Sequence, residues 1–291
     1  MNVPLLNASG CLDAFTAPGV ARQFDAFVTK TVTPLPREGN PPPRIAETDY
    51  GMLNSIGLQN PGLEAFARES LPLLAALGVQ VWVSVGGFSA RDYAEICERL
   101  DHEAAVSVIE LNLSCPNVEE APETAAEIVT AARGVTSKPL YAKLSPATWD
   151  IAENARAVAA AGADGLSLVN TIRGLALEST MRQPKLARGA GGYSGPALRP
   201  ISLACVEACA RAVSLPIVGM GGVRTGEDVV DLVATGAGAV ALGTILFSDP
   251  FASGRIRAEL GSIGAPATVA RGRPIHGLLR DSASSHVLLA E

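Results

Sequence analysis

The sequence lacks the features that would direct it to a membrane or to nucleic acid. No charged stem followed by an apolar block opens the chain, so we expect no signal peptide. Gly, Pro or a charged residue interrupts every apolar run well short of the roughly 20 residues that span a bilayer. Basic residues are too few for a broad contact with a phosphate backbone, because 23 Lys and Arg stand against 29 Asp and Glu, a net charge of −6. We therefore expect an acidic protein with neither membrane nor nucleic acid as a partner.

Cysteine is scarce, and its spacing forms no ligand pair. The five cysteines lie at scattered positions with no CxxC arrangement: Cys11, Cys97, Cys115, Cys205 and Cys209. An odd, scattered set argues against a disulfide framework, so we expect reduced thiols in a cytoplasmic protein. Cys97, Cys205 and Cys209 fall on helical stretches with apolar neighbours and are interpreted as small buried side chains, whereas Cys11 stays ambiguous.

The abundant residues form an alternating pattern of short apolar runs and longer alanine-rich stretches. Hydrophobic residues make up 48% of the 291, which is enough for a packed core. Eight runs are candidate strands: residues 5–8, 26–32, 79–85, 106–113, 140–144, 165–170, 216–220 and 239–243. Helical spacing marks residues 62–77, 90–100, 123–133, 150–161, 200–212, 227–234 and 250–260, and the first spacer, 18–23, has room for about two turns.

Eight apolar strands separated by helical segments predict an α/β fold of the closed (β/α)8 type, a TIM barrel. A doubly wound open sheet is the alternative. No linker-like segment divides the chain, so we expect one domain over residues 1–291, with a tail from 262 to 291 whose packing is left open. Two insertions, 34–49 and 171–196, interrupt the repeat, and loops of that length tend to bind ligands or cover a site.

Polar or glycine residues follow the predicted strands, and in a barrel these strand ends meet at one rim. The loops after the seventh and eighth strands hold Gly221-Gly222 and Gly243-Thr244, where barrels frequently bind a phosphate, although each glycine alone could serve a tight turn. Lys30 and Lys143 lie in apolar strands, where burying an ammonium is costly. Each lysine therefore either forms a salt bridge in the barrel mouth or faces an electron-rich or anionic cofactor.

Amides and one thiol complete the set at the strand ends. A flat heterocycle would suit the donors and acceptors of four asparagines, although Asn is also common in turns: Asn54, Asn112, Asn117 and Asn170. Cys115 lies in a Ser-Cys-Pro-Asn loop between two of them, and none of the three histidines of the chain stands at a strand end. The thiol thus lacks the imidazole partner of a Cys hydrolase, and proton acceptance by a thiolate is the role left open.

Three segments of the chain resemble the dihydroorotate dehydrogenases. Residues 54–62 read NSIGLQNPG, residues 110–117 read ELNLSCPN and residues 191–197 read GGYSGPA. The resemblance runs from Asn7 to about Phe251. It implies an FMN-containing barrel that oxidises dihydroorotate to orotate in pyrimidine synthesis.

The resemblance also implies a role for individual residues. Cys115 matches the base that removes the C5 proton of dihydroorotate while hydride passes from C6 to the flavin. The residues that match FMN contacts are Ser9, Lys30, Thr31, Asn112, Lys143, Val169, Gly195, Gly221, Gly222, Gly243 and Thr244. The residues that match substrate contacts are Lys30, Asn54, Ser55, Ile56, Gly57, Leu58, Asn112, Asn117, Asn170 and Thr171. No metal site is expected.

With a cysteine at the position of the base, the chain resembles the soluble class of the family. The membrane-associated, quinone-using class has a serine at that position. The segments at 170–174 and 191–197 are more similar to the catalytic subunit of the NAD-linked form than to the fumarate-reducing form, which is the nearest competitor. The NAD-linked form pairs with an FAD and [2Fe–2S] electron-transfer subunit. Because this chain has no Cys cluster for an iron–sulfur centre, we expect a separate partner of that kind on a homodimeric core.

Three departures from the family pattern accompany the resemblance. The chain begins almost at the first barrel strand, without the N-terminal hairpin expected at the bottom of the barrel. The loop at 118–122 looks shorter than the lid of the family. Ser84 stands where the NAD-linked form usually has an FMN-contacting Asn, so Ser84 is left out of the predicted site.

Two other functions compete with dihydroorotate oxidation. A reductase of uracil-like rings, of the dihydropyrimidine dehydrogenase type, shares the Asn–Cys motif but usually has His where this chain has Asn117, and its ligand lacks a carboxylate. The second competitor is a non-catalytic FMN-binding barrel. Such a protein would not need Cys115, Lys30 or Lys143, so the presence of all three argues against it.

Overall fold

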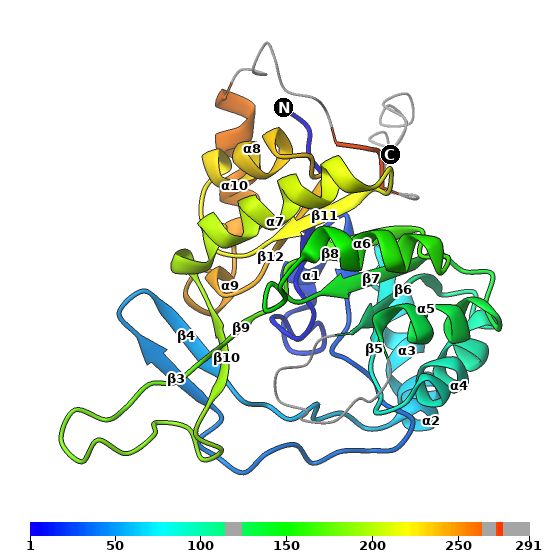
Figure 1. Ribbon diagram of the computed structural model, residues 1–291, viewed down its shortest axis with the longest axis horizontal. Helices are drawn as coiled ribbons and strands as arrows, with labels where there is room; N and C mark the ends of the chain where they lie inside the picture. Colours follow the sequence, from blue (N-terminus) through cyan, green and yellow to red (C-terminus); the bar gives the residue numbers. More distant parts are fainter. Residues whose placement is uncertain (114–123, 264–271, 276–291) are drawn as a thin grey trace, which may run out of the picture.

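The computed structural model describes residues 1–113, 124–263 and 272–275. Eight parallel strands close into a barrel in the order β1-β12-β11-β8-β7-β6-β5-β2 (Figure 1). Their bounds are β1 Leu5–Asn7, β2 Ala26–Val28, β5 Gln80–Val85, β6 Val106–Asn112, β7 Leu140–Leu144, β8 Gly165–Leu168, β11 Ile217–Met220 and β12 Ala239–Leu242. All eight predicted strands are confirmed, and closure between β1 and β12 excludes the open sheet.

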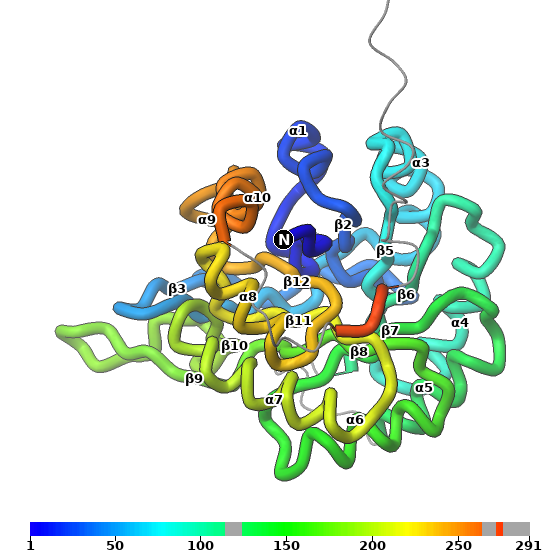
Figure 2. The backbone as a smooth tube through the Cα atoms, turned by 90° about the horizontal axis from the view of Figure 1, so that it is seen from above, coloured from blue at the N-terminus to red at the C-terminus, as the bar shows by residue number. Residues whose placement is uncertain are grey.

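Helices surround the barrel when it is seen from above (Figure 2). They are α1 Pro18–Ala21, α2 Leu63–Ala65, α3 Leu71–Ala75, α4 Ala90–Asp101, α5 Ala125–Arg133, α6 Ile151–Ala160, α7 Arg199–Ala212, α8 Gly226–Ala234, α9 Ile245–Ser248 and α10 Ala252–Ser262, with a 3-10 turn, η2 Pro196–Leu198, before α7. The stretch predicted as one helix over 62–77 is divided by a π-helical turn, η1 Phe66–Ser70. Pro72 explains the division, because proline has no N–H to continue the α-helical hydrogen bonds.

Local sequence sets where several of these helices begin. Thr124 and Glu127 form a reciprocal capping box at the start of α5, and Thr225 and Asp228 form another at the start of α8. The side chain of Asp150 accepts hydrogen bonds from two backbone N–H groups of α6. Short polar residues therefore satisfy helix ends that would otherwise leave N–H groups unpaired.

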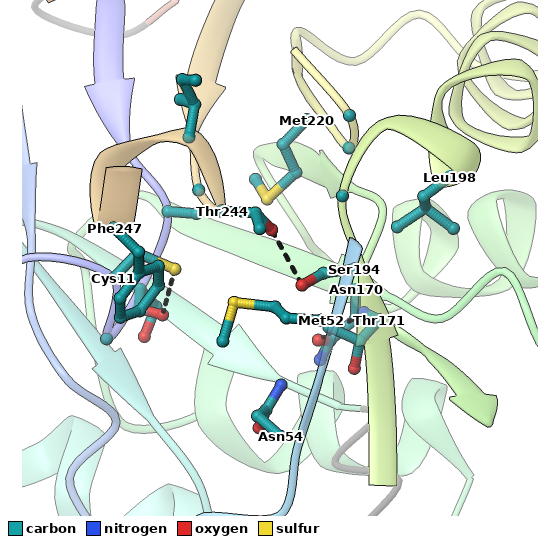
Figure 3. A pocket seen from close by; sticks show the side chains of 18 of the residues that line it. Cys11, Met52, Asn54, Asn170, Thr171, Ser194, Leu198, Met220, Thr244 and Phe247 are labelled. Atoms are coloured by element: carbon teal, nitrogen blue, oxygen red, sulfur yellow. Dashed lines mark hydrogen bonds between the residues drawn. The ribbon is translucent and has the colours of Figure 1, made fainter. Parts of the chain in front are cut away.

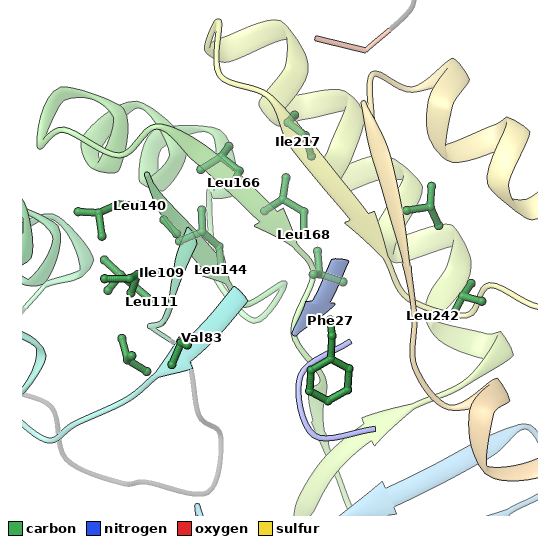
Figure 4. Close-up of a cluster of buried hydrophobic side chains, with 14 of the residues drawn as sticks. Phe27, Val83, Ile109, Leu111, Leu140, Leu144, Leu166, Leu168, Ile217 and Leu242 are labelled. Carbon is green, nitrogen blue, oxygen red and sulfur yellow. The ribbon is translucent and has the colours of Figure 1, made fainter. Parts of the chain in front are cut away.

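Alternation along the strands divides the apolar residues into two layers. Leu140, Ile109, Phe27 and their equivalents face outward and pack under the helices (Figure 4). The barrel interior is filled instead by side chains one position away on the strands, including Trp82 and Tyr141, whose rings lie 4.8 Å apart. Glycine is needed at 165, because a Cβ atom there would lie 2.2 Å from the Tyr141 ring. The interior is thus a packed core below the mouth of the barrel.

Part of the C-terminal tail closes the barrel at the end away from the second sheet (Figure 1). Ile275 is 3% exposed and joins the interior cluster that contains Leu6 and Ala26. Gly238 allows this close packing, because a Cβ atom there would lie 2.0 Å from the carbonyl oxygen of Arg273. The packing of the tail, left open by the sequence, is therefore settled for residues 272–275.

The two insertions, together with residues 51–54 that follow the first, form a second sheet that the sequence patterns did not predict. Its antiparallel order is β3-β4-β10-β9, and it projects from one side of the barrel (Figures 1 and 2). The strands are β3 Ile45–Thr48, β4 Gly51–Asn54, β9 Ile172–Gly174 and β10 Gly191–Ser194. Gly51 and Gly191 permit the central pairing, because a Cβ atom at either would lie within 2.5 Å of a carbonyl oxygen on the opposite strand. Within the described ranges, no helix has the length and apolar character needed to cross a bilayer.

Candidate active site

A cavity of about 330 Å³ lies between the C-terminal ends of the barrel strands and the second sheet (Figure 3). All eleven residues matched to FMN line it: Ser9, Lys30, Thr31, Asn112, Lys143, Val169, Gly195, Gly221, Gly222, Gly243 and Thr244. Of those matched to substrate, Asn54, Ile56, Gly57, Leu58, Asn170 and Thr171 also line it. The fold therefore brings together groups from both ends of the described chain, such as Ser9 and Thr244.

Three predicted residues need separate mention. Ser55 is not among the residues that line the cavity, so its predicted contact with the substrate stays a prediction. The chain alternates at this point, so Asn54 and Ile56 face the cavity while the Ser55 hydroxyl is buried and accepts a hydrogen bond of 2.9 Å from Asn40 Nδ2. Cys115 and Asn117 lie outside the described residues.

Several lining residues were missed by sequence reasoning. Met52 shares the cavity face of β4 with Asn54, and recognition of β4 as a strand would have found it by the period of two. Ser194 lies on β10 and accepts a hydrogen bond of 2.8 Å from the Thr244 hydroxyl, which joins the second sheet to the loop after β12. Phe247, on α9, borders the same cavity beside Cys11 (Figure 3). No local pattern marks Ser194 or Phe247, because their position depends on long-range pairing.

A chain of hydrogen bonds fixes the polar groups at the mouth. Thr31 Oγ1 lies 3.0 Å from the Ser84 hydroxyl and accepts from Asn112 Nδ2 at 3.3 Å. Asn112 Oδ1 accepts in turn from Asn170 Nδ2 at 3.1 Å. The Ser84 hydroxyl thus contacts Thr31 from the side away from the cavity, and Ser84 is not among the lining residues. The network orients both asparagine amides before any ligand binds.

Lys143 forms the salt bridge that the sequence left open as one of its two roles, and it also lines the cavity. Its ammonium lines the cavity and lies 3.5 Å from Glu110 Oε1, and both side chains are almost fully buried. Lys30 is more exposed, and its stem packs against Gly10, where a Cβ atom would lie 2.9 Å from Lys30 Cδ. Both ammonium groups are close enough to Cys11 to affect its thiol. Burial raises the pKa of Cys11, and the positive charges of Lys143 and Lys30 oppose that rise.

The charge of the lining has one sign. Lys30, Lys143 and Arg224 line the cavity, and none of its described lining residues is Asp or Glu. The whole chain nevertheless carries a net charge of −6, so the positive charge is a local property of this cavity. An arrangement of this kind favours an anionic ligand.

The loops after β11 and β12 offer backbone donors to such an anion. The N–H groups of Gly222, Val223 and Thr244 donate to no acceptor among the residues that the structure describes. The first turn of α8 is less available than expected, because Asp228 N donates to Thr225 and Gly226 N donates to Glu259. Gly221 and Gly222 have φ values of +124° and +77°, which side-chain-bearing residues rarely adopt. The candidate anion cradle is therefore built by the loops rather than by the start of α8.

The other described cysteines differ from Cys11, which lines the cavity. Cys97 and Cys209 are buried in the outer layer, and burial raises the pKa of each thiol to about 12. Cys205, interpreted from the sequence as a small buried side chain, is half-buried and packs against the same layer. These three thiols pack as small apolar groups, as their helical positions indicated.

Comparison with known proteins identifies relatives of the whole barrel. The model of a family described as dihydroorotate dehydrogenase matches residues 1–263. A protein of Listeria welshimeri named dihydroorotate dehydrogenase B (NAD(+)), catalytic subunit, is 43% identical over 267 residues, which cover 88% of each chain. A protein of Geobacillus kaustophilus with the same name is 42% identical over 269 residues, covering 88% of this chain and 85% of its own.

A solved structure shows the same fold. It is the DHODH of Eimeria tenella in complex with ferulenol, and it superposes with a TM-score of 0.73 over 88% of this chain and 80% of its own. The two sequences are 24% identical, so this likeness supports the barrel architecture alone.

Proposed function

The chain belongs to the dihydroorotate dehydrogenase family of oxidoreductases, and we propose that it oxidises (S)-dihydroorotate to orotate with FMN bound in the cavity. The observation that carries the proposal is the lining of Lys30, Lys143 and Arg224 without any acidic residue among its described members. Both the phosphate of FMN and the carboxylate of dihydroorotate are anions, and each would be repelled by an acidic lining.

The residues that line the cavity suit both the phosphate and the isoalloxazine ring of FMN. The N–H groups of Gly222, Val223 and Thr244, with Arg224 nearby, suit a phosphate. At the opposite part of the lining, Lys143 would face the isoalloxazine ring, with Thr31 and Asn112 held beside it by their hydrogen bonds. FMN, when bound, supplies the acceptor for the hydride from C6 of the substrate.

The substrate contacts divide between the barrel and the second sheet. The side chains of Asn112 and Asn170 are hydrogen-bonded to each other. Their remaining donors and acceptors would face the pyrimidine ring. Asn54 and Ile56 would cover the ring from the other side, and Lys30 would pair with the carboxylate. Cys115, outside the described residues, is proposed as the base that takes the C5 proton.

Flavin reduction tests the proposal directly. The purified chain should contain FMN, and anaerobic addition of dihydroorotate should bleach the flavin absorbance band. Dihydrouracil is the matched control, because it has the same ring without the carboxylate that Lys30 would bind. Bleaching by dihydrouracil and not by dihydroorotate would favour a uracil-type reductase, and FMN that neither compound reduces would indicate a non-catalytic barrel.

We further propose that electrons leave through a separate subunit carrying FAD and a [2Fe–2S] cluster, and that the core is a homodimer in a cytoplasmic enzyme. Support comes from the relatives, which are named catalytic subunits of NAD(+)-linked enzymes. The chain alone should then fail to reduce NAD and should gain that activity with the partner. Turnover by the chain alone with fumarate would instead place it in the fumarate-reducing form.

A further inference from the structure

Glu110 occupies an unusual position for a carboxylate. It lies on β6 and points into the barrel, on the same face as Val108 and Asn112, and its side chain is 2% exposed. Burial of a carboxylate is costly unless hydrogen bonds replace its hydration. Glu110 Oε1 nevertheless accepts no hydrogen bond from the described residues.

Comparison with Asp228 shows how uncommon this is. These two are the only acidic residues among the described ones that are buried. Asp228 lies 2.8 Å from Arg199 and accepts hydrogen bonds from two backbone N–H groups at the start of α8, so its burial serves a helix cap. Glu110 caps no helix and accepts no such backbone hydrogen bonds among the described residues, so its burial needs another explanation.

Lys143 provides that explanation. Its ammonium lies 3.5 Å from Glu110 Oε1, and 8% of its side chain is exposed. On the neighbouring strands Lys143 pairs with Asn112 and not with Glu110, so it lies nearer to the mouth than the carboxylate does. Lys143 lines the cavity and Glu110 does not. The carboxylate therefore stands behind the ammonium, on the side away from the cavity.

We propose that Glu110 is a positioning residue that holds the Lys143 ammonium at the floor of the cavity and lowers the reduction potential of the bound flavin. This inference rests on the proposed binding of FMN. It adds a residue that touches neither flavin nor substrate and acts through Lys143 alone.

The direction of the effect follows from the charges. Two-electron reduction makes the isoalloxazine ring electron-rich, and a nearby cation stabilises that form. The Glu110 carboxylate attracts the ammonium from the side away from the cavity and holds it back from the ring, so the reduced form is stabilised less. Replacement of Glu110 by Gln removes the negative charge with little change of volume. The equilibrium should then shift toward reduced flavin by about tenfold, which corresponds to about 30 mV for a two-electron couple.

The experiment compares midpoint potentials of the FMN-loaded protein by spectroelectrochemical titration. Glu110→Gln should raise the potential, and Glu110→Asp, which keeps the charge, should restore most of the original value. Ser167→Ala is the matched control: Ser167 pairs with Lys143 on the next strand, is fully buried, and its hydroxyl forms no hydrogen bond within the described residues. An equal shift in Ser167→Ala and Glu110→Gln would show that packing, not charge, sets the potential and would overturn the inference.

A second comparison tests whether Glu110 acts through Lys143. In a Lys143→Met background, Glu110→Gln should change the potential much less than it does in the original chain, because the ammonium it positions is gone. An undiminished effect in that background would reject the mechanism.

Loss of flavin from a variant is also informative. If Glu110→Gln loses FMN and Glu110→Asp retains it, the negative charge at this position is required, as the inference states. If both variants lose FMN, the charge does not account for the loss, and the inference is overturned. Absence of FMN from the unmodified protein would instead reject the proposed function itself. An unshifted potential in a Glu110→Gln protein that holds FMN would reject this inference alone.

Discussion

The closed barrel and the second sheet differ in how they are held together and in what they give the cavity. Barrel strands such as β7 and β12 are buried at every position, and most pair with the next barrel strand along the chain. In the second sheet, the side chain of Asn54 donates to the carbonyl of Gly192, a contact that spans 138 residues. That sheet is also less buried: β3 has no buried residue, and Tyr50 beside it is 72% exposed.

This difference assigns different tasks to the two regions. The barrel fixes the cations, the Asn112–Asn170 amide pair and the glycine loops in a packed frame. The second sheet covers that frame with Asn54, Met52 and Ser194, and a single hydrogen bond of 2.8 Å joins Ser194 to Thr244. Changes in the barrel should therefore impair chemistry, stability or flavin binding, whereas changes in the sheet should mainly weaken substrate binding.

The largest effect is expected at Cys115, which follows strand β6 by three residues in the sequence. Cys115→Ala should slow reduction of bound FMN by dihydroorotate by about 10²–10⁴-fold, because the proposed base is lost while the proposed flavin contacts are kept. Cys115→Ser should retain weak activity that rises with pH, since a hydroxyl is harder to deprotonate than a thiol near pKa 8.5. Stopped-flow absorbance measures both. Unimpaired reduction in the alanine variant would remove Cys115 from the mechanism.

The next effect concerns stability. Ile275→Ala should destabilise the barrel by about 2–4 kcal/mol, because it empties a buried site in the interior cluster. Leu177→Ala, in the segment between β9 and β10, is the control; Leu177 is 44% exposed, and its truncation should cost under about 0.5 kcal/mol. Thermal melts at fixed FMN concentration distinguish them. Similar melting temperatures for the two variants would contradict the closure of the barrel by the tail.

A third change tests the loop where the two regions meet. A Cβ atom at Gly222 would lie 2.8 Å from the backbone N of Arg199 and 2.9 Å from the carbonyl oxygen of Gly195, atoms that cannot move aside easily. Gly222→Ala should weaken FMN binding by about tenfold or more through displacement of the loop. Gly19→Ala is the control, because nothing lies within 4 Å of its Cβ position. Flavin fluorescence titration gives both dissociation constants, and equal values would exclude the loop from the phosphate site.

The smallest effect is expected in the second sheet. Asn54→Ala should raise the KM for dihydroorotate by about tenfold or less, with FMN content unchanged, because one polar contact to the substrate is lost. Glu47→Ala, on exposed β3 of the same sheet and outside the cavity lining, should leave KM as it is. Steady-state kinetics compare the two. Loss of FMN from Asn54→Ala would show that the sheet holds the flavin as well as the substrate.

The sequence alone was enough for the barrel and for most of the cavity lining. Each barrel strand is mostly apolar, and a polar or glycine residue lies at or just after its end, so strand and rim position could be predicted from neighbouring residues. The ambiguity at Lys143 could not be settled in this way. Its partner Glu110 lies on another strand, and only the register of β6 with β7 places the two together.

Tertiary structure alone decided the second sheet, the orientation of Ser55 and the packing of Ile275. Strand β3 of the second sheet has no buried residue and the other three strands contain glycine, so no apolar run distinguishes them from loops. They form because closure of the barrel brings the two insertions side by side, where their backbone groups can pair. Ile275 is buried for a similar reason: the open end of the barrel, and not the residues beside Ile275 in the chain, supplies the apolar site that it fills.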